Sequence, residues 1–136
     1  MSGVAKRAAP AAAAARPLGD DLARAYLLER FHDFLSVEQG SAHATSEAYG
    51  RDLERFATYM AVKGASTPAG VTPRLLREFV YYLKDLGLAP TSIRRNISAV
   101  RTYYRFLVGE GDVAQDPSER LETPKRWLML PDVLTV

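Results

Sequence analysis

Between residues 86 and 109 the chain carries four arginines and no carboxylate. The four arginines are Arg94, Arg95, Arg101 and Arg105. The nearest acids, Asp85 and Glu110, lie just outside this segment, although the whole chain is nearly balanced, with 18 basic and 16 acidic residues. A guanidinium can donate two parallel hydrogen bonds to a phosphate or to a guanine edge. This local excess therefore indicates a site for a polyanion, most commonly nucleic acid.

A helical projection separates these arginines from an apolar side. At 100° per residue, Ile97, Val100 and Tyr104 lie within about 40° of Ile93. The opposite side, between about 140° and 200°, holds short hydroxyl side chains and one arginine: Thr91, Arg95, Ser98 and Thr102. The pattern also fits a solvated face whose arginines pair with acids on neighbouring helices. No acid stands within the segment at helical spacing, which favours binding.

Four amphipathic helices are expected to position this face. Their ranges are about 20–38, about 45–62, from Pro73 to Gly87, and from Pro90 to Gly109. Thr72 and the two prolines mark helix starts, and glycines mark helix ends. The expected apolar stripes of the first three helices are Leu27, Phe31 and Phe34; Tyr49, Leu53, Phe56 and Met60; and Leu76, Phe79, Val80 and Leu83. Since no segment alternates with period two, we predict an all-α fold.

The second helix gives a weaker indication of the same chemistry. Arg51 lies nearly opposite the core-facing Tyr49, although acidic residues share that side. The first turn of the helix, at Thr45 and Ser46, can offer free main-chain N–H groups and the positive end of the helix dipole to a phosphate. Thus both helices are candidates for phosphate contact.

Composition excludes several classes of site. There is no cysteine, which excludes disulfides, thiolate catalysis and cysteine-ligated metals. The two histidines, His32 and His43, do not make a convincing metal site, and no apolar run approaches the roughly 18 residues of a membrane span. We therefore expect a cytoplasmic protein without a cofactor, a metal, a membrane partner or a small-molecule substrate.

Three segments are expected along the 136 residues. Residues 1–19 contain eight alanines and no acid, a composition that predicts a disordered tail. Residues 20–110 are expected to form the helical core domain. Residues 111–136 are expected to form an extended linker.

Three groups of residues resemble the N-terminal core-binding domain of the tyrosine recombinases, especially the Xer-type and phage-integrase branch. The first is the stretch from Thr45 to Leu53, which is similar to the family pattern Thr-x-x-Ala-Tyr-x-x-Asp-Leu. The second group is Ser92-Ile93, Arg95, Ser98-Ala99-Val100-Arg101 and Tyr104-Arg105-Phe106-Leu107. The third group, similar to the linker that leads into the family's catalytic domain, is Asp116-Pro117, Pro124-Lys125 and Leu130-Pro131-Asp132-Val133-Leu134-Thr135.

The resemblance implies a SAM-like integrase bundle of four helices that forms one half of a C-shaped clamp around duplex DNA. It also implies recombinase protomers as partners, since the family assembles as tetramers on DNA. Carried over position by position, the resemblance assigns DNA contact to seven residues: Thr45, Ser46, Arg51, Arg94, Arg95, Ser98 and Arg101. Gly50 and Asn96 depart from the family, which often has basic residues there. Gly50 also predicts a less regular second helix.

The resemblance also implies that the catalytic residues of the family lie in a separate catalytic domain. The catalytic half supplies two arginines, a lysine, a histidine and a nucleophilic tyrosine. Thr135 resembles the cap of the first catalytic-domain helix, and the chain stops at Val136. We therefore expect that this polypeptide alone does not cleave DNA.

Two other functions are considered. One is a small helical protein-interaction module, for which Tyr81-Tyr82 and Tyr103-Tyr104 would supply an aromatic surface. The other is an enzyme with carboxylate chemistry. Its only loose candidates are Asp20, Asp21 and Asp112. No histidine, cysteine or glycine-rich phosphate loop supports such an enzyme.

Overall fold

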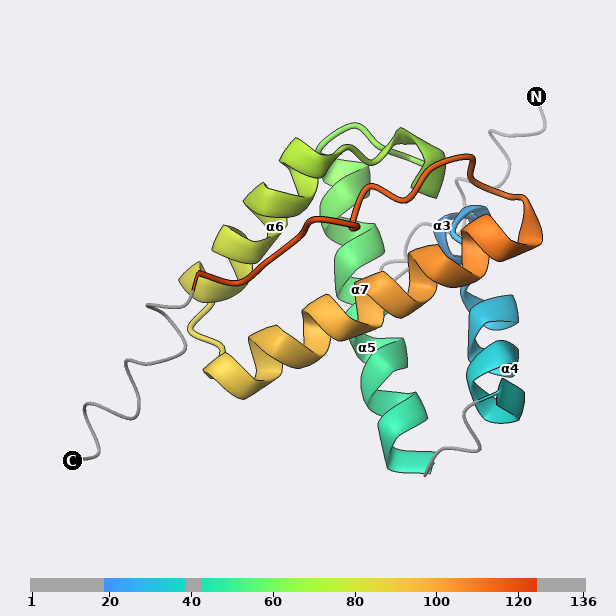
Figure 1. Cartoon of the computed structure of the whole chain (residues 1–136), viewed down its shortest axis with the longest axis horizontal. Coiled ribbons are helices and arrows are strands. Elements are labelled where there is room, and N and C mark those ends of the chain that lie inside the picture. The colour runs from blue at the N-terminus through green and yellow to red at the C-terminus, as the bar shows by residue number, and fades with distance from the viewer. Residues whose placement is uncertain (1–18, 39–42, 125–136) are drawn as a thin grey trace, which may run out of the picture.

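The computed structural model describes residues 19–38 and 43–124, and these form a bundle of helices without a strand (Figure 1). The helices are α3 (Asp20–Ala25), α4 (Leu28–Glu38), α5 (His43–Val62), the 3-10 helix η1 (Pro68–Gly70), α6 (Pro73–Asp85) and α7 (Pro90–Glu110). The expected all-α fold is confirmed. In Figure 1, α7 crosses α5 near the middle of both helices, with α4 and α6 on either side.

The single first helix expected over residues 20–38 is wrong, because the chain breaks into α3 and α4. At the break Leu27 has a φ of 55°, in the left-handed region that side-chain-bearing residues seldom adopt. Tyr26 just before it is fully buried, and its hydroxyl donates a 2.6 Å hydrogen bond to the carbonyl of Ala65. Tertiary contacts of Tyr26 therefore set the break, at a place where the sequence has neither glycine nor proline.

The second and third helices follow their expected patterns closely. In α5, Leu53, Phe56 and Met60 are buried and Tyr49 is half-buried. This helix runs without interruption through residue 50, so the less regular geometry expected there is wrong. In α6, the whole expected stripe is buried, and Thr72 caps the helix by accepting a 3.1 Å hydrogen bond from the amide of Leu75.

The fourth helix buries its expected stripe but ends later than predicted. All of Ile93, Ile97, Val100, Tyr104 and Leu107 are buried. The helix continues to Glu110 and is closed by Gly111 rather than by Gly109. Gly111 has a φ of 83°, a left-handed conformation that closes a helix at little cost only for glycine. Its amide and that of the next residue bond back to the last turn.

Aromatic rings fill the space where α5 and α7 cross. Phe56 of α5 makes edge-on contacts with Tyr103 and Tyr104 of α7, at 6.0 and 6.1 Å between ring centroids. It also packs edge-on against Phe79 of α6 at 5.4 Å and Tyr26 at 6.0 Å. Edge-to-face pairs at these separations are favourable, so the crossing is held by large rings in specific orientations.

The segment after α7 returns along the bundle as far as the described residues extend (Figure 1). Val113, Ser118 and Leu121 are buried, and the side chain of Asp116 accepts hydrogen bonds from the amide and hydroxyl of Ser118 at 2.8 and 2.6 Å. The first part of the expected linker therefore packs on the core. The rest of the linker, residues 125–136, and residues 1–18 of the expected tail lie outside the described residues.

Candidate nucleic-acid interface

The clearest charged feature of the α5–α7 crossing is an ion pair between Arg95 and Asp52. The Nε of Arg95 lies 2.7 Å from one carboxylate oxygen and its Nη2 lies 2.8 Å from the other. The side chain of Asp52 is only 1% exposed, whereas that of Arg95 is 40% exposed. The hydrogen bond to Asp52 raises the pKa of the Arg95 guanidinium above its ordinary value.

This pair corrects the sequence interpretation of Arg95. The projection placed Arg95 opposite the core, but its guanidinium reaches across to an acid on α5. The interpretation in which arginines pair with acids of neighbouring helices therefore holds for this residue. The projection fails here because it treats α7 as facing one core, while α5 crosses α7 and packs beside it.

A second cation borders the same carboxylate. The Nη1 of Arg55 lies 3.8 Å from Asp52, and the Arg55 side chain is half-buried. Two guanidinium groups around one carboxylate leave this cluster with one net positive charge. Because both cations stand toward the surface and the acid lies beneath them, the outward side of the cluster is positive.

Four side chains on α7 form a stripe next to this cluster, which we call the α7 stripe. They recur at intervals of four, three and four residues and so share one side of the helix: Arg94, Ser98, Arg101 and Arg105. Arg101 is half-buried and the others are exposed. Within the described residues, none of these three arginines forms an ion pair. The stripe is about 16 Å long at 1.5 Å per residue.

The predicted contact residues on α5 divide into exposed and buried ones. Thr45 and Arg51 are exposed, and Arg51 forms no ion pair in the part of the chain that the structure describes. Ser46 is only 5% exposed, so its hydroxyl is not part of the surface. The structure thus leaves Thr45 and Arg51 on the surface of α5 and places Ser46 inside.

Three residues of this surface were missed by the sequence prediction of contacts. Arg105 was recognised as basic but not assigned, although its spacing from Arg101 places it on the same stripe. Asp52 was identified only as part of the family pattern, and neither it nor Arg55 was assigned a contact. A signal existed for Asp52, because it lies three residues after Tyr49 and four before Phe56, on the apolar side of α5, and a buried carboxylate needs a cation.

Tyrosines expected to serve a protein-interaction module are mostly unavailable. Tyr103 and Tyr104 are fully buried, and their hydroxyls donate hydrogen bonds to the carbonyls of Tyr26 and Pro68 at 2.7 and 2.8 Å. Tyr82 packs against Tyr59 with the two rings tilted, at 4.6 Å between ring centroids. That leaves Tyr81, which is 56% exposed. One exposed ring does not make the aromatic surface that this interpretation requires.

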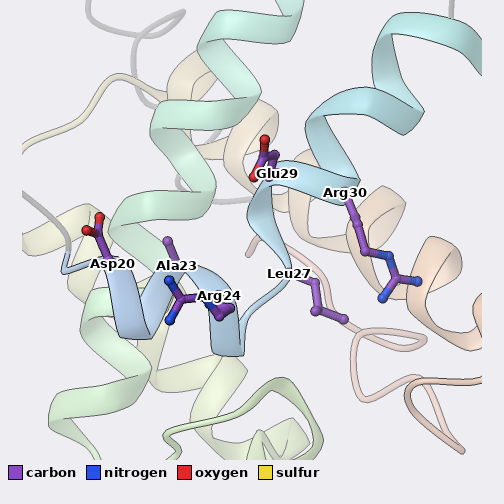
Figure 2. Close-up of a pocket in the computed structure, with 6 residues that line it drawn as sticks. All are labelled: Asp20, Ala23, Arg24, Leu27, Glu29 and Arg30. Atoms are coloured by element: carbon purple, nitrogen blue, oxygen red, sulfur yellow. The ribbon is translucent and has the colours of Figure 1, made fainter.

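A separate hollow of about 350 Å³ lies where α3 meets α4 (Figure 2). It is lined by Asp20, Ala23, Arg24, Leu27, Glu29 and Arg30. Arg24 pairs with Asp21 at 3.3 Å. In Figure 2 the Arg30 side chain extends from α4 toward α7. There it pairs with Glu110 and Asp112 at 3.2 and 3.1 Å.

Mixed and mutually paired charges make this hollow a poor anion site. Asp21 and Asp112, two of the acids considered for carboxylate chemistry, are paired with Arg24 and Arg30, respectively. The two pairs lie at separate places on the surface. Within the described residues, no group of three or more histidine, cysteine or acidic side chains is placed to hold a metal ion. None of the helices that the structure describes is long and apolar enough to cross a membrane.

The sequence of the helical core is similar to known proteins. The model of the family described as "Phage integrase, N-terminal SAM-like domain" matches residues 28–111. Tyrosine recombinase XerD of Oceanobacillus iheyensis is 36% identical over 111 residues, which cover 81% of this chain and 37% of that protein. The Brucella suis protein of the same name is 38% identical over 109 residues, covering 80% and 35%. That of Chlorobaculum tepidum is 35% identical over 109 residues, covering 80% and 36%.

The matched region contains the α7 stripe and the cluster of Asp52, Arg55 and Arg95. Residues 28–111 run from the start of α4 through the end of α7 and include both partners of the Arg95–Asp52 pair. The chain spans about a third of the length of these curated relatives. No solved structure is significantly similar to it.

Proposed function

The chain belongs to the tyrosine recombinase family as an N-terminal phage-integrase SAM-like domain, and on this premise we propose that it binds duplex DNA through α7 and the first half of α5. DNA carries closely spaced phosphate charges, and its major groove, about 12 Å wide, admits an α-helix. A helix that presents several unpaired guanidinium groups along one side suits both properties.

The observation that carries this proposal is the α7 stripe. Its arginines, Arg94, Arg101 and Arg105, form no ion pair within the described residues. Ser98 between them has a short side chain, which lets the helix approach the DNA closely. An ordinary solvated surface would pair many of these cations with carboxylates, as Arg30 is paired on the α3–α4 side.

The proposed contact set follows the predicted one, with two changes. It keeps Thr45, Arg51, Arg94, Arg95, Ser98 and Arg101. Arg105 is added because it extends the α7 stripe, and the hydroxyl of Ser46 is left out because it is buried. Arg95 contributes through the part of its guanidinium that Asp52 does not occupy.

Within a whole recombinase we propose that this domain is the clamp half that positions DNA. Cleavage and rejoining of the strands would then depend on residues that a longer protein supplies, because the curated relatives are named tyrosine recombinases and the aligned residues cover only 37% and 35% of their length. Other recombinase protomers on the same DNA are the proposed protein partners.

A salt titration tests the proposal. Fluorescence anisotropy of a labelled 30-base-pair duplex is measured at salt concentrations from about 50 to 300 mM, where phosphate contacts make log K fall linearly with log salt by about 0.9 per contact. The double variant Arg94→Ala/Arg101→Ala should lower the slope by about two. The matched control is Arg24→Ala/Arg77→Ala, which removes the same charge from exposed sites on α3 and α6.

The control should keep the wild-type slope within about half a unit, since its arginines lie away from the α7 stripe. Duplex affinity that does not change with salt would contradict the proposal. Equal slopes for the two double variants would contradict the assignment of DNA binding to α7.

A further inference from the structure

Asp52 occupies only one edge of the Arg95 guanidinium. A guanidinium carries five N–H donors in a rigid plane, and the edge formed by Nε and Nη2 is the one that faces the carboxylate. Two of the five donors are therefore used. The remaining three include the end-on pair, one N–H from each Nη atom, which can bind two acceptors side by side.

The depth of the two side chains indicates where this free edge lies. Asp52 is buried beneath the surface, while two fifths of the Arg95 side chain is exposed. Because the Nε and Nη2 side of the guanidinium is against the buried carboxylate, the Nη1 side points away from Asp52. Two short hydrogen bonds hold the plane in a fixed orientation, so the free edge does not have to be ordered when a ligand binds.

Position along α7 indicates what this edge would meet. Arg95 is adjacent to Arg94 and stands one turn before Ser98, so it lies beside the α7 stripe, about 100° around the helix from its line. When a helix lies along the major groove, side chains in the middle of its inner face reach the bases, and those at its flank reach the sugar-phosphate backbone. A fixed guanidinium at the flank suits the two free oxygens of a phosphate.

We propose that Asp52 is a positioning residue, which holds Arg95 so that its end-on edge binds a DNA backbone phosphate. This inference rests on the proposed function, since it names how one arginine of that interface is oriented. It differs from the simplest alternative, in which Asp52 only neutralises Arg95 and so weakens its attraction to DNA. The two accounts predict opposite signs when the carboxylate is removed.

The variant Asp52→Asn separates these accounts. Removing a negative charge near the interface should tighten duplex binding if Asp52 is only a neutraliser. Loss of the fixed orientation should instead weaken binding by about tenfold at 100 mM salt, as expected for one charge-assisted bidentate contact. The matched control is Glu54→Gln, the same change of charge at an exposed position on α5. It should bind as tightly as wild type or slightly more tightly.

A second variant tests the geometry of the arginine itself. Arg95→Lys keeps the charge but has no rigid pair of donors, so we expect it also to lose about tenfold. The double variant Asp52→Asn/Arg95→Lys should lose little more than either single variant, because both remove the same contact. Asp52→Asn binding as tightly as Glu54→Gln, or losses that add up fully in the double variant, would overturn the inference.

Wild-type protein provides a measurement that does not depend on a variant folding. Side-chain nitrogen NMR spectra recorded during a duplex titration should show the Nη resonances of Arg95 shifting, while its Nε–H resonance stays in place because Asp52 still holds it. Movement of the Arg94 and Arg101 resonances without any movement of Arg95 Nη would overturn this inference and leave the proposed function standing. No binding of duplex at all would instead overturn the proposed function.

Discussion

The hydroxyl of Tyr103 on α7 donates a 2.7 Å hydrogen bond to the main-chain carbonyl of Tyr26, where α3 ends. In a continuous helix that carbonyl would accept the amide of Arg30, four residues on. The break at Leu27 frees the carbonyl, and Tyr103 satisfies it inside the core. The left-handed backbone of Leu27 and the contact between α7 and the N-terminal helices are therefore parts of one arrangement.

Replacing Tyr103 by phenylalanine should lower the free energy of unfolding by about 1–3 kcal/mol, because the buried carbonyl of Tyr26 loses its partner. Urea denaturation followed by circular dichroism measures this change. The control is Tyr82→Phe, since the Tyr82 hydroxyl makes no hydrogen bond within the described residues, and it should change stability by less than about 0.5 kcal/mol. Equal effects of the two substitutions would contradict the importance of this bond.

Three buried tyrosines predict that the fold is sensitive to alkaline pH. Tyr26, Tyr103 and Tyr104 each donate to a main-chain carbonyl, and burial raises the pKa of all three phenols above the ordinary value of about 10. Above pH 10 the unfolded chain loses these protons while the folded chain keeps them. Their contribution to stability is thus complete below pH 10 and decreases as the pH rises further.

With three such groups the free energy of unfolding should decrease by about 4 kcal/mol per pH unit above pH 10, at about 1.4 kcal/mol for each group. Tyrosinate absorbance at 295 nm and helical circular dichroism should be recorded together from pH 8 to 12. Part of the absorbance of the seven tyrosines should appear only as the helical signal is lost. Complete tyrosinate formation near pH 10 in a protein that remains helical would contradict this prediction.

Gly50 offers a stabilising substitution on α5. It lies inside a continuous helix, and a Cβ added there would meet no atom within 4 Å. Gly50→Ala should therefore raise the free energy of unfolding by up to about 1 kcal/mol. The contrasting variant is Gly64→Ala, because Gly64 has a φ of 102° and alanine would be strained there. Thermal melts should move in opposite directions; a lower melting temperature for Gly50→Ala would contradict the prediction.

Helical spacing was enough to predict most of the core. The stripe of Leu76, Phe79, Val80 and Leu83 is buried as expected, because a period near 3.6 with one apolar side has few other ways to fold. The family resemblance was likewise confirmed. The local sequence pattern therefore predicts well which residues are buried when a helix packs a single face against the core.

What the sequence did not predict depends on contacts between distant residues. The break at Leu27 depends on the neighbouring Tyr26, whose hydroxyl bonds to Ala65 in the loop after α5, and this contact leaves no local signal. The pairing of Arg95 depends on how α5 crosses α7, and a projection of one helix contains no information about its neighbour. Hence the arginines could be found from sequence, but which of them is already paired could not.

Asn96 provides a final prediction, because its amide is buried with one polar atom unsatisfied. The side chain is 0% exposed, and its Nδ2 donates a 2.8 Å hydrogen bond to the carbonyl of Ser92, but its Oδ1 has no partner within the described residues. An unpaired buried acceptor is costly. The Ser92 carbonyl keeps the main-chain bond of α7 when the amide is removed.

Asn96→Leu, which has a similar shape and no polar atom, should therefore raise the free energy of unfolding by about 1 kcal/mol in urea denaturation. Asn96→Ala removes the same amide but leaves unfilled space, so it should be less stable than the leucine variant by about 1 kcal/mol or more. Both variants keep the Arg95–Asp52 pair, which can be checked by unchanged salt dependence of duplex binding. If the leucine variant lost more than about 1 kcal/mol, the amide would have to make a stabilising contact, and the interpretation of Asn96 as an unsatisfied group would be wrong.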